Sequence, residues 1–138
     1  MYLLDTNVVS ELRKVYPGKA HPNVKNWFSS IDGADVFLSV ITLQELEIGV
    51  LLLERKDSRQ GEILRAWVEG YVIPTFNENL LDVSREIALA SARYYIPNPR
   101  PARDALIAAT AEVHKMTIVT RNTADFEGLG VKILNPWL

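Results

Sequence analysis

Residues Asp104 to His114 read DALIAATAEVH, and Thr117 to Thr120 read TIVT. The first segment is apolar on most of its faces when drawn as a helix, which is typical of a buried helix. The second is a short apolar segment of strand length. A buried helix that leads directly into a strand is the repeating unit of α/β proteins, so this stretch predicts a parallel sheet covered by helices.

The rest of the chain repeats this alternation. The apolar patterns predict further strands at Tyr2–Leu4, Asp35–Val40 and Val131–Leu134, and a strand or extended edge segment at Val72–Phe76. They predict further helices at Asn7–Lys14, from His21-Pro22 onward, through Leu43, Leu46, Val50 and Leu53, at Glu62–Val72 and at Leu80–Tyr95. Parallel strands joined by right-handed crossovers place functional sites at the carboxyl ends of the strands, near the point where the strand order reverses.

The composition limits the class of protein. The chain has 138 residues, 48% of them hydrophobic, which predicts one domain, residues 1–138, with a core of its own. Cysteine is absent, which excludes a disulfide scaffold, a zinc–thiolate site and thiol catalysis. The formal net charge of −2 argues against binding of nucleic acid through a general positive field, although a local patch could still bind it.

The start of the sequence and the length of its apolar runs bear on export and on membrane insertion. The start, MYLLDTNVVSEL, has no basic segment and is interrupted by Asp5 and Glu11, unlike a signal peptide. The longest apolar run, Ile48 to Leu53, is far shorter than the roughly 20 residues of a membrane-spanning helix. We therefore expect a soluble cytoplasmic protein that does not enter the membrane.

Four acidic residues stand at the ends of predicted elements. Each has an ordinary structural explanation: Asp5 as a helix N-cap, Glu45 in a capping box with Thr42, Asp104 at the positive end of a helix, and Asp125 in a turn. The predicted sheet, however, gathers all four at one rim. Asp104 in particular precedes the apolar run of its helix, where an unpaired charge is costly.

Carboxylates that lie close together repel and raise one another's pKa, and a divalent cation removes this repulsion. Carboxylates without cysteine select hard ions such as Mg²⁺ or Mn²⁺. Such a site suits hydrolysis of a phosphodiester by a bound water, with one ion or with two; the sequence does not decide between them. Arg100 and Arg103, beside Asp104, are either phosphate contacts or solvated side chains.

Other catalytic patterns are absent. The chain contains no phosphate-binding P-loop, no GxGxxG and no HExxH. Its two histidines, His21 and His114, show no spacing that supports a Ser–His–Asp triad.

At these residues the sequence resembles the PIN-domain ribonucleases, and most of all the VapC toxins of bacterial toxin–antitoxin pairs, within the FitB-like group. Four motifs in the same order cover essentially the whole chain. They are Leu3–Glu11; Leu38–Thr42 with Glu45-Leu46 and Ile48-Gly49; Asp104–Ala111; and Val119–Asn122 with Asp125-Phe126, followed by Asn135-Pro136-Trp137.

The resemblance implies a three-layer α/β/α sandwich and a Mg²⁺- or Mn²⁺-dependent endoribonuclease with a VapB-like antitoxin as partner. It implies a homodimer, which in some relatives assembles further. It also assigns catalysis and metal binding to Asp5, Glu45, Asp104 and Asp125. Some relatives carry an acid where this chain has Asn122, so either Asp125 or Asn122 completes the site; Asn7, Thr120 and Asn122 would orient the carboxylates.

Two other functions are compatible with the residues. Asp5 after a strand could be the nucleophile of a phosphatase, although Asn7 stands where such enzymes carry a second aspartate. The acids could also bind a metal without turnover, as in an inactive interaction module.

Overall fold

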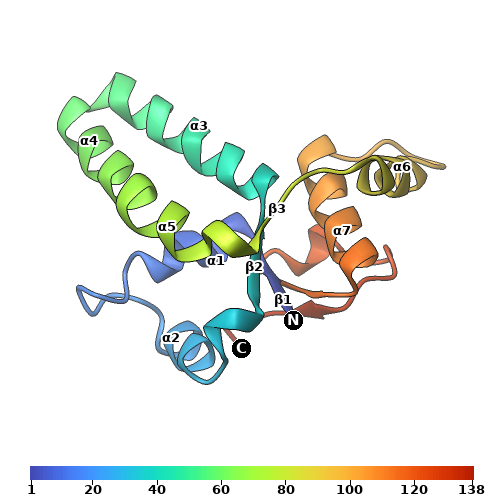
Figure 1. The fold of residues 1–138 in the computed structure, drawn as a ribbon, viewed down its shortest axis with the longest axis horizontal. Coiled ribbons are helices and arrows are strands. Elements are labelled where there is room, and N and C mark those ends of the chain that lie inside the picture. Colours follow the sequence, from blue (N-terminus) through green and yellow to red (C-terminus); the bar gives the residue numbers. More distant parts are fainter.

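The structure, a computed structural model, describes residues 1–138 and is built on a five-stranded parallel sheet (Figure 1). The strands are β1 Tyr2–Leu4, β2 Val36–Ser39, β3 Leu80–Leu81, β4 Thr117–Val119 and β5 Ile133–Leu134. Their order is β3-β2-β1-β4-β5, and every neighbouring pair is parallel. The chain builds outward from β1 to β3 and then continues on the other side of β1, so the strand order reverses between β1 and β4.

Helices cover both faces of this sheet. They are α1 Thr6–Leu12, α2 Pro22–Ser29, α3 Val40–Lys56, α4 Ser58–Trp67, α5 Ile73–Phe76, α6 Arg85–Arg93 and α7 Ala102–His114. In Figure 1, α1, α3, α4 and α5 lie on one side of the strands, and α6 and α7 on the other. The prediction of an α/β/α sandwich around a parallel sheet is therefore confirmed. No helix combines the length and the apolar character that crossing a membrane requires.

Successive strand residues feed two separate cores. Leu4, Leu38 and Val119 pack in the cluster that contains α1, α3 and the turn after α4. Leu3 and Ile118 pack in the other cluster, with α6 and α7. Because side chains alternate between the faces of a strand, neighbouring apolar residues serve opposite layers, and the strands are apolar apart from Ser39 and Thr117.

Helix α7 is the buried helix that its composition predicts. Ile107, Ala108 and Ala109 are inaccessible to solvent, and the small alanine side chains let the helix pack closely on the sheet. The helix begins at Ala102, which places Asp104 in its first turn, at the carboxyl end of the sheet. It ends at His114, and the following residue, Lys115, has a left-handed φ of 56° that stops the helix.

The expectation of an extended segment at Val72–Phe76 is wrong. A π-helical turn, Val68–Val72, continues from α4 and leads into the short helix α5, Ile73–Phe76. Pro74 lies in the first turn of α5, where a missing N–H costs little, so this proline is compatible with helix.

The predicted helix Leu80–Tyr95 is also too long. Leu80 and Leu81 form the edge strand β3 and pair with Leu38 and Ser39 of β2. Helix α6 starts only at Arg85. Its N-cap is Ser84, whose Oγ accepts a hydrogen bond from the Ile87 N–H. The two leucines fit a helical period and a strand equally well, and pairing with β2 decides between them.

The predicted capping box of Thr42 and Glu45 does not form. Helix α3 begins earlier, at Val40, with Ser39 as its N-cap. Thr42 is buried inside the helix, and its hydroxyl has no hydrogen-bond partner. Glu45 therefore lies in the second turn of α3, free to contact other elements.

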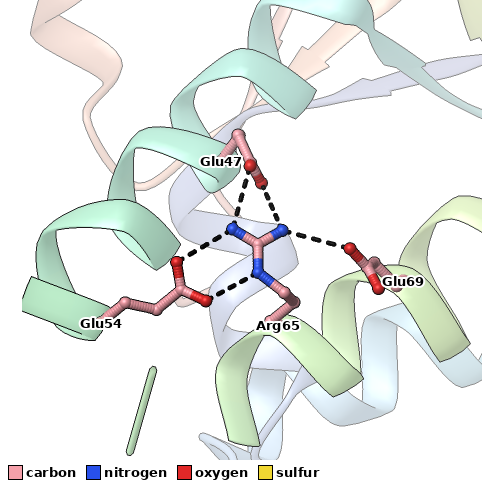
Figure 2. Close-up of polar contacts among 4 residues, drawn as sticks. All are labelled: Glu47, Glu54, Arg65 and Glu69. Atoms are coloured by element: carbon pink, nitrogen blue, oxygen red, sulfur yellow. Dashed lines mark hydrogen bonds and ion pairs between the residues drawn. The ribbon is translucent and has the colours of Figure 1, made fainter. Parts of the chain in front are cut away.

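Helices α3 and α4 form an antiparallel hairpin that extends away from the sheet (Figure 1). Figure 2 shows Arg65 of α4 between three glutamates: Glu47 at 3.1 Å, Glu54 at 2.8 Å and Glu69 at 3.1 Å. These hydrogen bonds raise the pKa of Arg65 above its usual value, so the guanidinium stays charged and ties α4 to α3. At Gly61 the helices approach so closely that an added Cβ would lie 2.5 Å from the Glu54 Cα.

Candidate active site

Asp5 lies where β1 ends and α1 begins, beside the reversal of strand order. Its Oδ1 accepts a hydrogen bond of 2.9 Å from the Thr6 N–H, so Asp5 is the N-cap of α1. The residue is only 6% exposed. Burial is the largest influence on its pKa and raises it, although hydrogen bonds from Thr120 and Thr6 act in the opposite direction.

Asp5 is held by side chains from two neighbouring strand ends. Its Oδ2 accepts hydrogen bonds from Thr120 Oγ1 at 2.8 Å and from Asn7 Nδ2 at 3.1 Å. Asn7 Oδ1 in turn accepts the backbone N–H of Arg121, and Thr120 Oγ1 accepts that of Asn122. These bonds join the ends of β1 and β4 and fix the orientation of the Asp5 carboxylate.

Of the three predicted orienting residues, Asn7 and Thr120 contact Asp5 through their side chains. Asn122 contributes only its backbone N–H, and the residue is exposed. Asp125 is also exposed, in the short helical turn Thr123–Asp125.

Glu45 reaches the same rim from α3. Its Oε1 accepts a hydrogen bond of 2.6 Å from Thr6 Oγ1, and its Oε2 lies 3.3 Å from Arg103 Nε. Thr6 thus links the first two acids, because its backbone N–H donates to Asp5 and its hydroxyl donates to Glu45. Thr6 was not among the predicted site residues, and Arg103 was expected to contact phosphate or solvent rather than Glu45.

Asp104 shows that the four carboxylates share one electrostatic environment. Burial and then the negative charges of Asp125, Asp5 and Glu45, in that order, raise its pKa to about 6. Arg103 opposes them, with the weakest influence of the five. Asp125, despite its exposure, is therefore the acid that acts most strongly on Asp104.

The donor set fits a hard divalent ion in chemistry but is not assembled as a finished cage. Four carboxylates supply the oxygen ligands that Mg²⁺ and Mn²⁺ prefer. No three acidic or histidine side chains lie close enough together to chelate an ion as they stand. Glu45, one of the four acids, is instead engaged by Arg103.

A groove leads from this rim along α1 and the α3–α4 hairpin. It encloses about 600 Å³ and runs from Thr6 and Glu45 past Arg13 to Leu64 and Trp67. At Arg13, Pro17 and Trp67 it joins an apolar hollow of about 540 Å³. That hollow is completed by Leu12, Val15, Tyr16, Ile63 and Tyr71. From α3, Glu45, Leu46 and Gly49 line the groove, while Val50 is buried in the core.

The PIN domain family model matches residues 2–131. The chain belongs to the PIN-domain family. The chain is 37% identical over 144 residues to "Toxin FitB" of Neisseria gonorrhoeae, with 99% of both chains covered. It is 35% identical over 142 residues to "VapC ribonuclease Y4jK" of Sinorhizobium fredii, covering 99% of this chain and 98% of that one.

Two solved structures show the same fold. The crystal structure of FitAcB from Neisseria gonorrhoeae superposes with a TM-score of 0.87 at 35% identity, covering 99% of both chains. A toxin–antitoxin complex from Klebsiella pneumoniae superposes with a TM-score of 0.68 at 27% identity, covering 99% of this chain and 98% of that one. The resemblance to the FitB-like VapC proteins is therefore confirmed.

Proposed function

We propose that this PIN-domain protein is a Mg²⁺- or Mn²⁺-dependent endoribonuclease and the toxin of a VapBC-type toxin–antitoxin pair. The observation that carries this proposal is the electrostatic convergence of Asp5, Glu45 and Asp125 on Asp104 at the carboxyl end of the sheet. The relatives named as a toxin and as a VapC ribonuclease support the same assignment.

In this proposal Asp5, Glu45, Asp104 and Asp125 would hold the divalent ion. Such an ion lowers the pKa of a bound water and neutralises charge that develops on phosphoryl oxygens. Thr120 and Asn7 fix the Asp5 carboxylate, so that its position does not depend on the ion. Thr6 holds one oxygen of Glu45 and leaves the other for ligation once Arg103 moves away.

A phosphatase with Asp5 as nucleophile is not favoured. Both carboxylate oxygens of Asp5 accept hydrogen bonds, Oδ1 from Thr6 and Oδ2 from Asn7 and Thr120. Asn7, which stands where such a phosphatase carries a second aspartate, donates to Asp5 Oδ2 and supplies no acid.

Divalent metal should both stabilise the protein and switch on RNA cleavage. A ligand that binds only the native state stabilises it by mass action, so at 100 times the Kd the gain is about 2.7 kcal/mol. We expect Mg²⁺ or Mn²⁺ at millimolar concentration to raise the Tm of the EDTA-treated protein and to allow cleavage of single-stranded RNA. Both effects should be reversed by excess EDTA. Cleavage that persists in EDTA would contradict the proposal.

We further propose that an antitoxin lies in the groove and inserts a basic side chain among the acids. The apolar hollow beside Trp67 and Tyr71 fits the apolar side of a peptide segment, and the groove leads from there to Glu45. Arginine suits the acidic end, because its planar fork pairs with carboxylate oxygens and stays charged. We expect the chain to act as a homodimer, with each copy binding one such segment.

The expected result is that one basic residue of the antitoxin carries most of the inhibition. Replacing the basic residues in the antitoxin's C-terminal half by glutamine, one at a time, should restore RNA cleavage for the residue that reaches the acids. The complex itself should survive, because the apolar contacts remain; size-exclusion chromatography of each variant complex provides this control. If no single replacement restores cleavage while the complex still binds Mn²⁺ like the free toxin, inhibition does not act through the acidic rim.

A further inference from the structure

The strongest unexplained contact at the acidic rim is the ion pair between Arg103 and Glu45. Arg103 lies in the first turn of α7 and Glu45 in α3, two helices on opposite faces of the sheet (Figure 1). Their Nε and Oε2 atoms are 3.3 Å apart. The pair therefore crosses the sheet edge at the carboxyl ends of the strands, where the four acids converge.

Arg103 is the only cationic side chain in direct ion-pair contact with any of the four acids. The remaining ion pairs, such as Lys14 with Glu11 and Arg93 with Glu112, involve other carboxylates. Its charge offsets only part of the negative charge, because the three neighbouring carboxylates still outweigh it at Asp104. Arg103 thus occupies one position that a cation would take, without neutralising the site.

The contact also occupies a carboxylate oxygen that an ion would need. Glu45 has two carboxylate oxygens, and Thr6 and Arg103 engage one each. The Thr6 hydroxyl can stay in place when Glu45 binds an ion, because a carboxylate oxygen has more than one lone pair. Arg103 is displaced, because its positive guanidinium and a divalent cation on the same Oε2 repel each other, whereas the Thr6 hydroxyl is neutral.

We propose that Arg103 is an internal counter-ion that competes with the divalent ion for Glu45 and so weakens the affinity of the site for metal. This proposal rests on the metal-dependent function proposed above. Arg103 is a positioning residue that acts through Glu45. Its side chain is 52% exposed, so it can leave for solvent when the ion arrives. An exposed ion pair is weak, so the competition tunes the affinity without abolishing binding.

The test compares Arg103→Gln with Arg100→Gln. Both variants remove one positive charge near the start of α7, but Arg100 Nε donates to the Tyr94 carbonyl and has no acidic partner. We expect Arg103→Gln to bind Mn²⁺ about two- to fivefold more tightly than the wild type, by isothermal titration, because an exposed pair competes with about that strength. Arg100→Gln should bind as the wild type does. Equal affinity of all three proteins, or equal tightening in both variants, would overturn the proposal.

A second measurement follows the guanidinium itself. In ¹H–¹⁵N spectra the Arg103 Nε–H signal, assigned by its loss in Arg103→Gln, should shift when Mg²⁺ is added to the EDTA-treated protein. In Glu45→Gln the signal should start near its metal-bound position and move little. If the Arg103 Nε–H signal of the wild type does not shift at saturating Mg²⁺, Arg103 does not leave Glu45. That result would contradict competition between Arg103 and the ion.

The outcomes separate this inference from the proposed function. Tighter Mn²⁺ binding in Arg103→Gln without RNA cleavage by any variant would support the counter-ion and overturn the ribonuclease. Metal-dependent RNA cleavage together with unchanged Mn²⁺ affinity in Arg103→Gln would support the ribonuclease and overturn the counter-ion. If neither the wild type nor Arg103→Gln binds Mn²⁺, both proposals fail.

Discussion

Replacing Asp104 with asparagine should abolish RNA cleavage and, at neutral pH, make the protein more stable. Cleavage should fall at least about 100-fold, because losing even outer-sphere partners of a metal site costs about 10- to 100-fold. The gain in stability follows from the raised pKa: the Asp104 carboxylate is charged at pH 7 in a place that burial and three like charges make unfavourable. Initial cleavage rates with Mg²⁺, and denaturant unfolding with EDTA, measure the two effects.

The raised pKa of Asp104 determines how the stability gain of Asp104→Asn changes with pH. The pKa of Asp104 is about 6 in the folded protein against the ordinary value of 3.8, so the folded state binds more protons between these values. Stability must therefore fall as the pH rises through this window, and the whole penalty is present above about pH 6. Solvent screens this partly exposed carboxylate, so Asp104→Asn should gain about 2 kcal/mol at pH 7, less than the full shift would give, and almost nothing near pH 4.

Asp35→Asn is the matched control for charge removal. Asp35 is exposed, lies at the opposite end of β2 from the acids, and makes no ion pair or side-chain hydrogen bond. Its replacement should leave cleavage intact and change stability little at either pH. An Asp104→Asn variant that cleaves RNA at the wild-type rate, or that is less stable at pH 7 than at pH 4 relative to wild type, would refute the assigned environment.

Much of the fold was predictable because most elements carry a strong local pattern. Tyr2–Leu4 and the helix that contains Asp104 were placed correctly, because a strongly apolar segment is stable almost only when it is buried in the core. Val72–Phe76 and Leu80–Leu81 were misassigned. There the local pattern is ambiguous, and the outcome depends on tertiary partners: the turn that continues α4 in one case, and pairing with β2 in the other.

The site, like the fold, was predictable in part. The rule that parallel strands deliver their carboxyl ends to one edge is sufficient to bring Asp5 and Thr120 together, and they are hydrogen bonded. The partners of Glu45 were not predictable. Thr42, three residues away, offered a plausible local partner, whereas Thr6 and Arg103 are distant in sequence and meet Glu45 only through the packing of α3 against the sheet edge.

Gly61→Ala should have the largest effect on stability of any single-methyl change in the helical hairpin. The added Cβ would lie 2.5 Å from Glu54 Cα and 2.6 Å from Glu54 N, which are backbone atoms that cannot rotate away. Helix α4 must then separate from α3, which strains the ion pairs of Arg65 with Glu47 and Glu54 (Figure 2). We expect a loss of about 1–3 kcal/mol in the free energy of unfolding, despite alanine's better helix propensity.

Gly49→Ala in α3 separates the effect of steric crowding from the effect of alanine's helix propensity. Gly49 is also inside a helix, but apart from its chain neighbours and the backbone of its own helix, no atom lies within 4 Å of the position where its Cβ would stand. There the substitution should gain up to about 1 kcal/mol, because alanine loses less backbone entropy on folding. Urea unfolding of both variants measures the contrast. Helix α4 carries Leu64 and Trp67 of the groove, whereas the acids lie at the start of α1, on α3 and α7, and in the turn Thr123–Asp125. Folded Gly61→Ala should therefore keep its RNA cleavage but respond less to the antitoxin. Equal stability of the two variants would mean that α3 and α4 do not cross as closely as Gly61 requires.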